Sequence, residues 1–136
     1  KLDLHPDFPK RGQRTLDSTG EINIAEEDLS RLVEGKIHRL MDYCNFEVKD
    51  GKYIYVSEIY EDFKSSKNKG RIIHWLPEDK TMVVNVVLED NSTALGLGEE
   101  SMKELKDGEI VQLERNYFAR VDKKEKNKIV FWYLHK

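Results

Sequence analysis

Short apolar or alternating runs, separated by turn residues, recur along almost the whole chain. Runs of this kind predict β-strands when Gly, Pro, Asn and Asp bound them. Only two segments, 25–35 and 99–108, favour short helices. The sequence therefore predicts an all-β chain of the barrel type. The expected strands are 21–24, 36–49 (one long strand or two with a kink), 52–60, 71–76, 81–90, two strands within 108–122, and 129–136.

Local residue chemistry sharpens several of these expectations. The Asp50-Gly51 pair is typical of a two-residue hairpin turn. In the strand that follows it, Ile54, Val56 and Ile59 are expected to point inward. Further expectations are a helix over 25–35 with Leu29, Leu32 and Val33 on one face, a polar loop at 63–71, burial of both faces of 81–90, and a loop at 91–98.

Composition limits the classes of protein to which the chain can belong. Hydrophobic residues make up 38% of the 136 residues, which predicts a thin core of the kind that fills a small barrel. The net charge is −3, so RNA binding would need a local basic face and a specific target. The single cysteine, Cys44, excludes an internal disulfide and suggests a reducing, cytoplasmic compartment. The apolar runs are too short to cross a bilayer, and the absence of an initiator Met suggests a fragment of a larger protein.

Catalytic and metal-binding motifs are weak in this sequence. GLGEES at 96–101 has two glycines, but the acids that follow them would repel a phosphate group. The four histidines have no ligand spacing, and Cys44 has no cysteine or paired histidine nearby in the sequence. We therefore expect neither a metal site nor catalytic residues in this chain.

The segment GEIVQLERNYFARVD, residues 108–122, is the best candidate for a binding surface. It reads as two strands that meet near Asn116, with Gln112, Arg115, Tyr117 and Arg120 interleaved among apolar residues. An amide, guanidinium groups and a phenol are the groups that hold an unstacked RNA base. The sequence thus predicts one wall of an RNA-binding site, against the alternative of an ordinary solvated strand face.

Four segments resemble one family in order and spacing. They are HPDFPKRGQRT (5–15), LVEGKIHRLMDYCN (32–45), GRIIHWLP (70–77) and GEIVQLERNYFARVD (108–122). The chain resembles the β-barrel anticodon-binding region of archaeal and eukaryotic-type glutamyl-tRNA synthetases and of the related glutaminyl-tRNA synthetases. The compact middle and the ending YLHK look more like the archaeal glutamyl branch. A glutaminyl enzyme remains the alternative.

The resemblance implies two small β-barrels of the ribosomal protein L25-like type. Residues 1–43 and 106–136 would form a proximal anticodon-binding barrel that lacks the family's first strand. Residues 44–105 would form a distal barrel inserted between the two proximal segments.

The resemblance also implies roles for individual residues. Gln112 and Arg115 fall where the glutaminyl enzymes place base-contacting residues. Arg31 matches an arginine that contacts the anticodon, and Arg39 matches an arginine that either binds phosphate or pairs with a nearby acid, Glu34 or Asp42. Arg14 and Lys10 match a turn that could contact phosphate. Tyr117 is a candidate for base stacking, whereas Trp75 is expected in the core.

If the resemblance holds, the parent protein is an ATP-dependent glutamate–tRNA ligase whose catalytic domain, with ATP and Mg²⁺, lies outside this chain. The chain itself would read the anticodon of a tRNA, with tRNA-Glu preferred to tRNA-Gln, and would need no cofactor of its own. Its partners would be tRNA and the parent's catalytic domain, not DNA or a membrane. The alternatives from other classes are a free-standing RNA-binding β-barrel and a protein-interaction barrel that binds no RNA.

Overall fold

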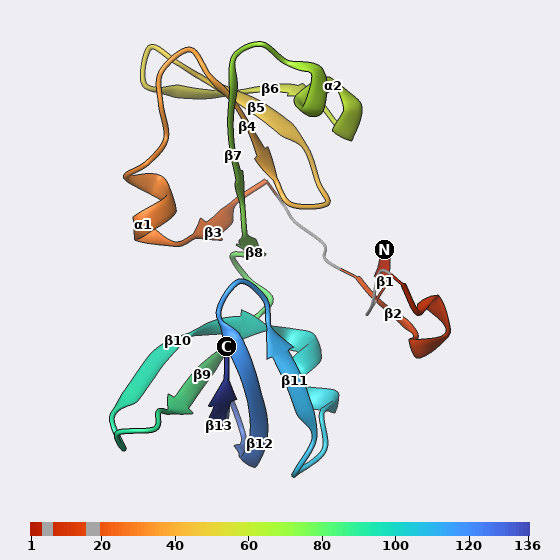
Figure 1. The fold of residues 1–136 in the computed structure, drawn as a ribbon, viewed down its shortest axis with the longest axis vertical. Coiled ribbons are helices and arrows are strands. Elements are labelled where there is room, and N and C mark those ends of the chain that lie inside the picture. The colour runs from red at the N-terminus through yellow and green to blue at the C-terminus, as the bar shows by residue number, and fades with distance from the viewer. Residues whose placement is uncertain (4–6, 16–19) are drawn as a thin grey trace. The chain divides into compact units, whose positions relative to one another are not determined.

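The computed structural model describes residues 1–3, 7–15 and 20–136, and it is built mostly from strands (Figure 1). The predicted all-β class is confirmed, and the larger sheets curl into partial barrels. The chain divides into two compact units, Lys1–Leu76 and Pro77–Lys136.

The first unit contains three sheets. Its central sheet has the strand order β6-β5-β4-β7, so β6 is an edge strand. Strands β1 and β2 form one small sheet, and β3 and β8 form another. The bounds are β1 Leu2–Asp3, β2 Gln13–Arg14, β3 Ile22–Ile24, α1 Glu26–Leu29, β4 Ile37–Leu40, β5 Asn45–Lys49, β6 Lys52–Ser57, α2 Tyr60–Ser65, β7 Lys69–Ile73 and β8 Trp75–Pro77, with a 3-10 helix at Pro9–Arg11.

Turn chemistry sets the hairpins of the central sheet. Asp50 and Gly51 have φ angles of 51° and 69°, and they join β5 to β6 in the predicted two-residue turn. Positive φ at both turn residues matches the right-handed twist of the flanking strands. Segment 36–49 forms two strands, β4 and β5, which pair antiparallel across a turn in which Asp42 has φ 55°. Strand β7 then returns parallel to β4.

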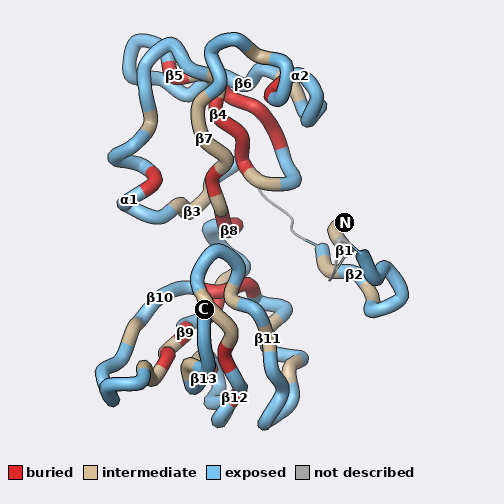
Figure 2. The backbone as a smooth tube through the Cα atoms, viewed as in Figure 1, coloured by how far each residue is buried: buried red, intermediate tan, exposed pale blue. Residues whose placement is uncertain are grey.

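The core of the first unit lies on one face of this sheet. Because side chains alternate across a strand, Phe46 and Val48 of β5 point the same way and are buried (Figure 2). Trp75 is in the core, as the sequence predicts, and its Nε1 donates to the carbonyl oxygen of Met41 at 2.9 Å. The buried cluster consists of Leu40, Cys44, Phe46, Val48, Ile73 and Trp75, with Ile22, Ile24 and Leu32 packed against it.

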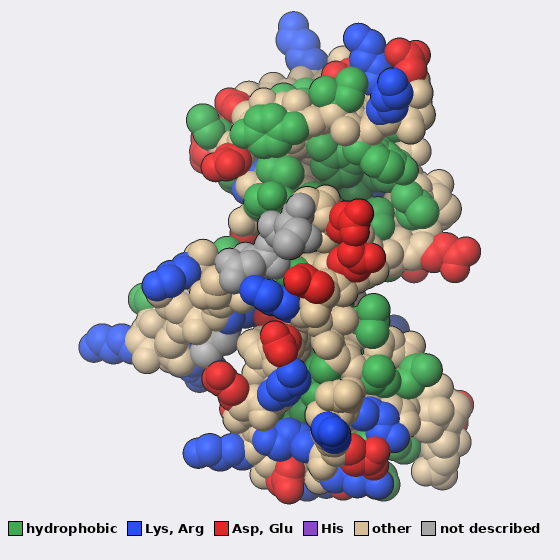
Figure 3. Space-filling model, turned by 180° about the vertical axis from the view of Figure 1, so that it is seen from behind, with side chains coloured by type: hydrophobic (Ala, Val, Ile, Leu, Met, Phe, Trp, Pro, Cys, Tyr) green, Lys and Arg blue, Asp and Glu red, His purple; other side chains and the backbone are tan. Residues whose placement is uncertain are grey.

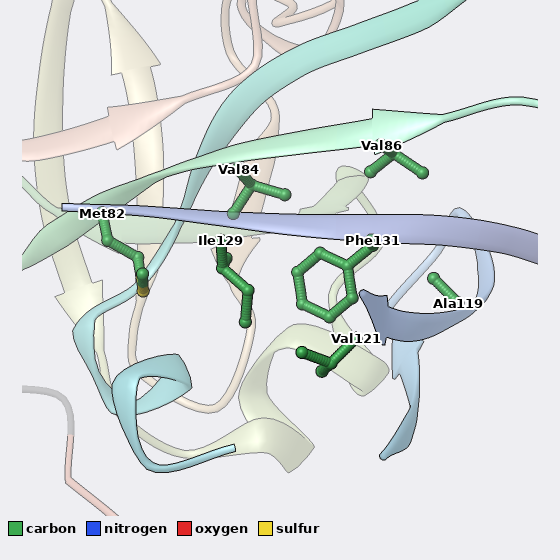
Figure 4. Close-up of a cluster of buried hydrophobic side chains, with 7 residues drawn as sticks. All are labelled: Met82, Val84, Val86, Ala119, Val121, Ile129 and Phe131. Atoms are coloured by element: carbon green, nitrogen blue, oxygen red, sulfur yellow. The ribbon is translucent and has the colours of Figure 1, made fainter. Parts of the chain in front are cut away.

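The second unit is one five-stranded sheet of order β10-β9-β13-β12-β11. All its pairings are antiparallel except that of β9 with β13, which is parallel. The bounds are β9 Thr81–Val87, β10 Thr93–Glu99, β11 Ile110–Leu113, β12 Tyr117–Glu125 and β13 Lys128–His135, with a 3-10 helix at Glu100–Glu104. Its core is Met82, Val84, Val86, Ala119, Val121, Ile129 and Phe131 (Figure 4).

The helix predicted over 25–35 is much shorter than expected. α1 ends at Leu29, and Leu29 and Val33 are exposed whereas Leu32 packs on the core. After Leu29 the α-helical bonds give way to the tighter bonds of Arg31 to Asp28 and of Leu32 to Leu29, and the amide of Val33 donates to Nε2 of His38 at 3.2 Å. The Oγ atom of Ser30 also bonds the carbonyl oxygen of Glu27 at 2.8 Å, a local contact that competes with helix propagation.

Four further predictions, about strands, loops and a helix, are wrong as well. Residues 91–98 were expected as a loop, but β10 occupies most of this segment because Gly98 lets the strand approach Val84 and Met102 closely. The segment 81–90 alternates between buried and exposed positions, since only one face of β9 meets the core. The helix expected at 99–108 is the short 3-10 helix Glu100–Glu104, and α2 reaches into the expected loop 63–71.

The inward orientation expected of Ile54, Val56 and Ile59 is also wrong, because all three side chains are exposed. Ile54 lies opposite Glu47 on the face of the edge strand β6 that points away from the core, Val56 lies at a register shift, and Ile59 follows the strand at the start of α2. The compact units also part at a different place from the barrel boundaries 1–43, 44–105 and 106–136, and β9 shares a sheet with β13. Those boundaries stay a prediction.

Candidate nucleic-acid interface

The hairpin of β11 and β12 carries four of the residues that the sequence singled out, Gln112, Arg115, Tyr117 and Arg120. Its register pairs Gln112 with Phe118 and Leu113 with Tyr117. Directly opposed residues project to the same face of a sheet. Gln112 and Phe118 therefore share the outer face, whereas Leu113 and Tyr117 face the core of the second unit.

The outer face of this hairpin presents both polar and flat groups. The side chain of Gln112 is exposed at its cross-strand position opposite Phe118. The ring of Phe118 stacks on that of His135, with centroids 4.9 Å apart and planes inclined by 29°. One pair along, Arg120 lies between Ile110 on β11 and Trp132 on β13 in the strand register. An amide and a guanidinium beside exposed rings can bond and cover an unstacked base.

Arg115 sits at the tip of the hairpin in an unusual backbone conformation. Its φ angle is +64°, and it lies in a turn in which the amide of Asn116 donates to the carbonyl oxygen of Leu113 at 2.9 Å. The other non-glycine residues of the described chain with positive φ are Asp42, Asp50 and Asn91. Asp and Asn tolerate this region, but for arginine it costs about 1–2 kcal/mol. A residue kept in a strained conformation is a candidate for function.

Tyr117 is not on the face that carries Gln112. Its ring packs edge-on against Tyr133, with centroids 5.2 Å apart and planes at 75°, and it contacts the core of the second unit. Burial raises the pKa of the Tyr117 phenol above its ordinary value. The structure therefore brings Gln112 and Arg115 onto one hairpin but turns the ring of Tyr117 toward the core.

Arg31 follows α1 and has an exposed side chain. Its Nη2 lies 2.6 Å from Oε1 of Glu27, one helical turn earlier. Both side chains of this ion pair are more than half exposed, so the pair contributes at most about 1 kcal/mol to stability. The guanidinium can exchange this partner for a phosphate at little cost.

Arg39 has a very different environment, because its side chain is buried within the first unit. Its Nη1 donates to Oδ1 of Asn45 at 2.8 Å and to the carbonyl oxygen of Glu58 at 3.2 Å, and its guanidinium lies 5.5 Å from the centre of the Tyr60 ring. Asn45 in turn donates from Nδ2 to Oγ of Ser57 and to the carbonyl oxygen of Ile59, both at 2.8 Å. These partners differ from the acids Glu34 and Asp42 that the sequence suggested.

Arg14 lies on β2, opposite Leu2 of β1. Lys10 is exposed in the neighbouring 3-10 helix, where Arg11 places its guanidinium 5.3 Å from the centre of the Phe8 ring. The His-Pro pair at the start of this segment lies outside the described residues. Arg14, Arg31 and Arg39 thus come from three separate segments of the chain: β2, the turn after α1, and β4.

Charge is mixed over both units. Figure 3 shows Lys and Arg side chains over the unit of β9 to β13, interspersed with Asp and Glu. Some of these lysines are engaged: Lys123 and Lys128 pair with Glu125 at 3.5 and 3.2 Å, and Lys124 donates to the carbonyl oxygen of Lys103 at 3.1 Å. Within the described residues, no group of His, Cys, Asp or Glu could hold a metal ion, and no helix is long and apolar enough to cross a membrane.

The sequence interpretation missed several exposed aromatic residues. Phe118 and Trp132 lie on the outer face of the second unit, and Tyr53 and Tyr55 project from the edge strand β6. Hairpin parity could have found Phe118, because a three-residue loop after Leu113 places residue 118 opposite Gln112. No sequence signal marked β6 as an edge strand.

The fold and this polar hairpin define the class of protein once they are compared with known families. A family model described as the anticodon-binding domain of class I tRNA synthetases (E and Q) matches residues 1–63, and a second model with that description matches residues 72–122. The chain belongs to this family of anticodon-binding domains.

Its relatives with curated names include glutamate–tRNA ligases. The enzyme of Methanobrevibacter smithii is 41% identical over 133 residues, which are 98% of this chain and 23% of the relative. Those of Pyrococcus furiosus and Methanocaldococcus jannaschii are 39% and 35% identical, and each alignment covers all of this chain and 24% of the relative. The chain therefore spans about a quarter of the length of these relatives.

Proposed function

We propose that this chain is the anticodon-reading part of a glutamate–tRNA ligase, and that its RNA partner is tRNA-Glu. In this proposal the parent protein attaches glutamate to tRNA in the cytoplasm with ATP and Mg²⁺, and that chemistry takes place outside the chain. Membership of the family and the names of the relatives support the assignment.

The observation that carries the proposal is the hairpin of β11 and β12. It presents an exposed amide at Gln112 and a guanidinium at Arg115. Arg115 has a positive φ angle, a backbone conformation that favours Gly or Asn over Arg. An amide can pair with the Watson–Crick edge of an unstacked base, and a guanidinium can bond a base edge or two phosphate oxygens. We assign base contact to these two residues.

The remaining candidates take supporting roles in this proposal. Arg31 and Arg14 would contact the phosphate backbone. Arg39 would act through the fold, because its hydrogen bonds to Asn45 and Glu58 occupy Nη1 inside the first unit. Tyr117 would support the hairpin from the core side rather than stack on a base, since its ring packs against Tyr133.

Aminoacylation by the full-length parent tests the proposal directly. We expect Gln112→Ala and Arg115→Ala each to reduce kcat/KM for wild-type tRNA-Glu by the equivalent of about 1–3 kcal/mol, the scale of a bidentate base contact. Lys126→Ala is the matched control, because it removes a charge at the far end of β12 from the turn that holds Arg115. Equal activity of both hairpin variants and the control would remove the hairpin from the site.

A second arm of the experiment changes the RNA instead of the protein. If the parent charges a tRNA with altered anticodon bases as efficiently as the natural one, anticodon reading is wrong. Charging with glutamine instead of glutamate would assign the chain to a glutaminyl enzyme, which the family description also covers.

A further inference from the structure

The edge strand β6 exposes two tyrosines on one of its faces. Tyr53 and Tyr55 are each 62% exposed, and the register places them directly opposite Val48 and Phe46 of β5. Val48 and Phe46 belong to the buried cluster of the first unit. The two tyrosines therefore extend the core face of the sheet outward to its open edge, where solvent reaches their rings.

The buried side chain of Phe46 packs against the ring of Tyr53. Tyr53 meets Phe46 edge-on, with centroids 6.1 Å apart and planes at 85°. Residues two apart on a strand are separated by about 6.6 Å, so Tyr53 and Tyr55 form a short row of rings along β6. A buried phenylalanine beneath an exposed tyrosine limits the ring's freedom, so less entropy is lost when a ligand stacks on it.

A third tyrosine extends the row toward the turn between β4 and β5. Tyr43 is 41% exposed and stacks on Trp75, with centroids 4.9 Å apart and planes inclined by 30°. Trp75 is fixed by its bond to Met41. Trp75 belongs to the same buried cluster as Phe46, so Tyr43 borders the same core as the two tyrosines of β6.

We infer that Tyr43, Tyr53 and Tyr55, here called the tyrosine platform, stack on unpaired RNA bases. This inference rests on the proposed function and adds a second contact surface, in the first unit, to the hairpin of the second. The family match over residues 1–63 includes all three tyrosines. Figure 3 shows hydrophobic side chains gathered over the unit that contains β4 to β7.

The chemistry of the surface favours RNA over a protein partner. The rings carry phenol hydroxyl groups and offer flat faces, and every base has a face that can stack on them without sequence preference. Lys52 and Lys49 pair in register at the end of the hairpin and, because side chains alternate along a strand, they project to the face opposite Tyr53 and Tyr55. RNA would therefore meet the tyrosine face through its bases, with its phosphates turned away from the sheet.

Binding of an RNA hairpin with 2-aminopurine in its unpaired loop tests the platform. The affinity of the chain is measured at low ionic strength, where backbone contacts are strongest. We expect Tyr53→Leu and Tyr55→Leu each to weaken binding by about 5- to 150-fold, and to reduce the quenching of 2-aminopurine that stacking causes. Tyr53→Phe and Tyr55→Phe keep the ring face and should stay within about threefold of the unsubstituted chain.

Two controls separate this inference from the proposed function. Ile54→Ala removes an exposed apolar side chain from the opposite face of β6 and should leave RNA affinity unchanged. Gln112→Ala tests RNA contact by the β11–β12 hairpin independently of the tyrosine platform. If Gln112→Ala weakens binding but both leucine variants bind normally, the platform is refuted while anticodon reading stands, and the tyrosines are left as a surface for a protein. If the unsubstituted chain does not bind the RNA hairpin, the platform is refuted, and anticodon reading is decided separately by aminoacylation with the full-length parent.

Discussion

Gly70 lies against the imidazole of His38. A Cβ atom at position 70 would come within 2.6 Å of both Cε1 and Nδ1 of that ring, a separation that real Cβ atoms essentially never show. The ring itself is fully buried and stacks on Phe46 with a centroid distance of 5.6 Å. Because Gly70 has no side chain, strand β7 can pair with β4 while the His38 ring of β4 occupies the space beside Gly70.

We expect Gly70→Ala to lower the free energy of unfolding by about 1–3 kcal/mol, the usual cost of overpacking a core. Urea denaturation measures this change. Gly96→Ala is the matched control, because Gly96 also lies in a strand but a Cβ atom there would meet nothing within 4 Å. Equal changes in unfolding free energy for the two substitutions would show that the His38 ring can move away from a Cβ atom at position 70 without loss of stability.

His38 should make stability depend on pH. Burial lowers the pKa of its imidazole, and the charges of Lys36 and Arg71 lower it further. The unfolded ring takes up a proton near the ordinary value of about 6.5, where the folded ring is still neutral. The unfolded state therefore binds more protons in this range, and stability falls as the pH drops.

The contribution of His38 is complete above pH of about 7.5 and is lost at up to about 1.4 kcal/mol per pH unit below about 6.5. The loss stops where the folded ring is itself protonated. His38→Phe keeps a ring against Phe46 but does not titrate, so the difference in unfolding free energy between it and the natural chain isolates the effect. A difference that is constant from pH 8 to about 5 would contradict this account.

Arg39 and Arg31 should separate stability from binding. Arg39→Met leaves Oδ1 of Asn45 and the carbonyl oxygen of Glu58 without their donor, and we expect a loss of about 1–3 kcal/mol in unfolding free energy. Arg31→Met breaks only the exposed pair with Glu27 and should cost less than about 1 kcal/mol. Arg31→Met should instead weaken RNA binding. Similar unfolding midpoints for the two variants would refute this division of roles.

Arg115→Gly should weaken RNA binding without destabilising the fold. Glycine adopts the φ of +64° freely, which offsets the greater flexibility that it gives to the unfolded chain. Unfolding free energy should therefore stay equal or rise by up to about 1 kcal/mol, while RNA affinity falls. Arg120→Gly is the control, since it removes the same side chain from the interior of β12 and should cost about 1 kcal/mol. A comparable loss of stability in Arg115→Gly and Arg120→Gly would show that the backbone of Arg115 is not strained.

Sequence reasoning succeeded where local chemistry decides the structure. The Asp50-Gly51 turn follows from two residues whose backbone tolerates positive φ, and the turn near Asn116 follows from the interruption of two alternating runs. The exposure of Gln112 also follows from alternation along a strand. These features need no knowledge of which strands become neighbours.

It failed where the order of strands in the sheet decides burial. Nothing local distinguishes Ile54, which is exposed, from the equally apolar Val84, which is buried. Ile54 of the edge strand β6 projects away from the core face that carries Tyr53 and Tyr55, whereas Val84 of the interior strand β9 points into the core. The environment of Arg39 depends in the same way on Asn45 and Glu58, which the sequence gives no reason to bring beside it. The side of the hairpin that Tyr117 faces depends on the length of the turn.

The buried amide of Asn45 has a consequence for the alignment of the edge strand. Its bonds to Ser57 and Ile59 hold the end of β6 at one position along β5, next to the irregularity between Asn45 and Phe46. A slip of one residue would turn every side chain of β6 to the opposite face. It would also break both bonds and leave the buried amide of Asn45 without them, at a cost of about 1–3 kcal/mol. The side-chain amide of Asn45 therefore favours the one strand register in which Tyr53 and Tyr55 both lie on the core face.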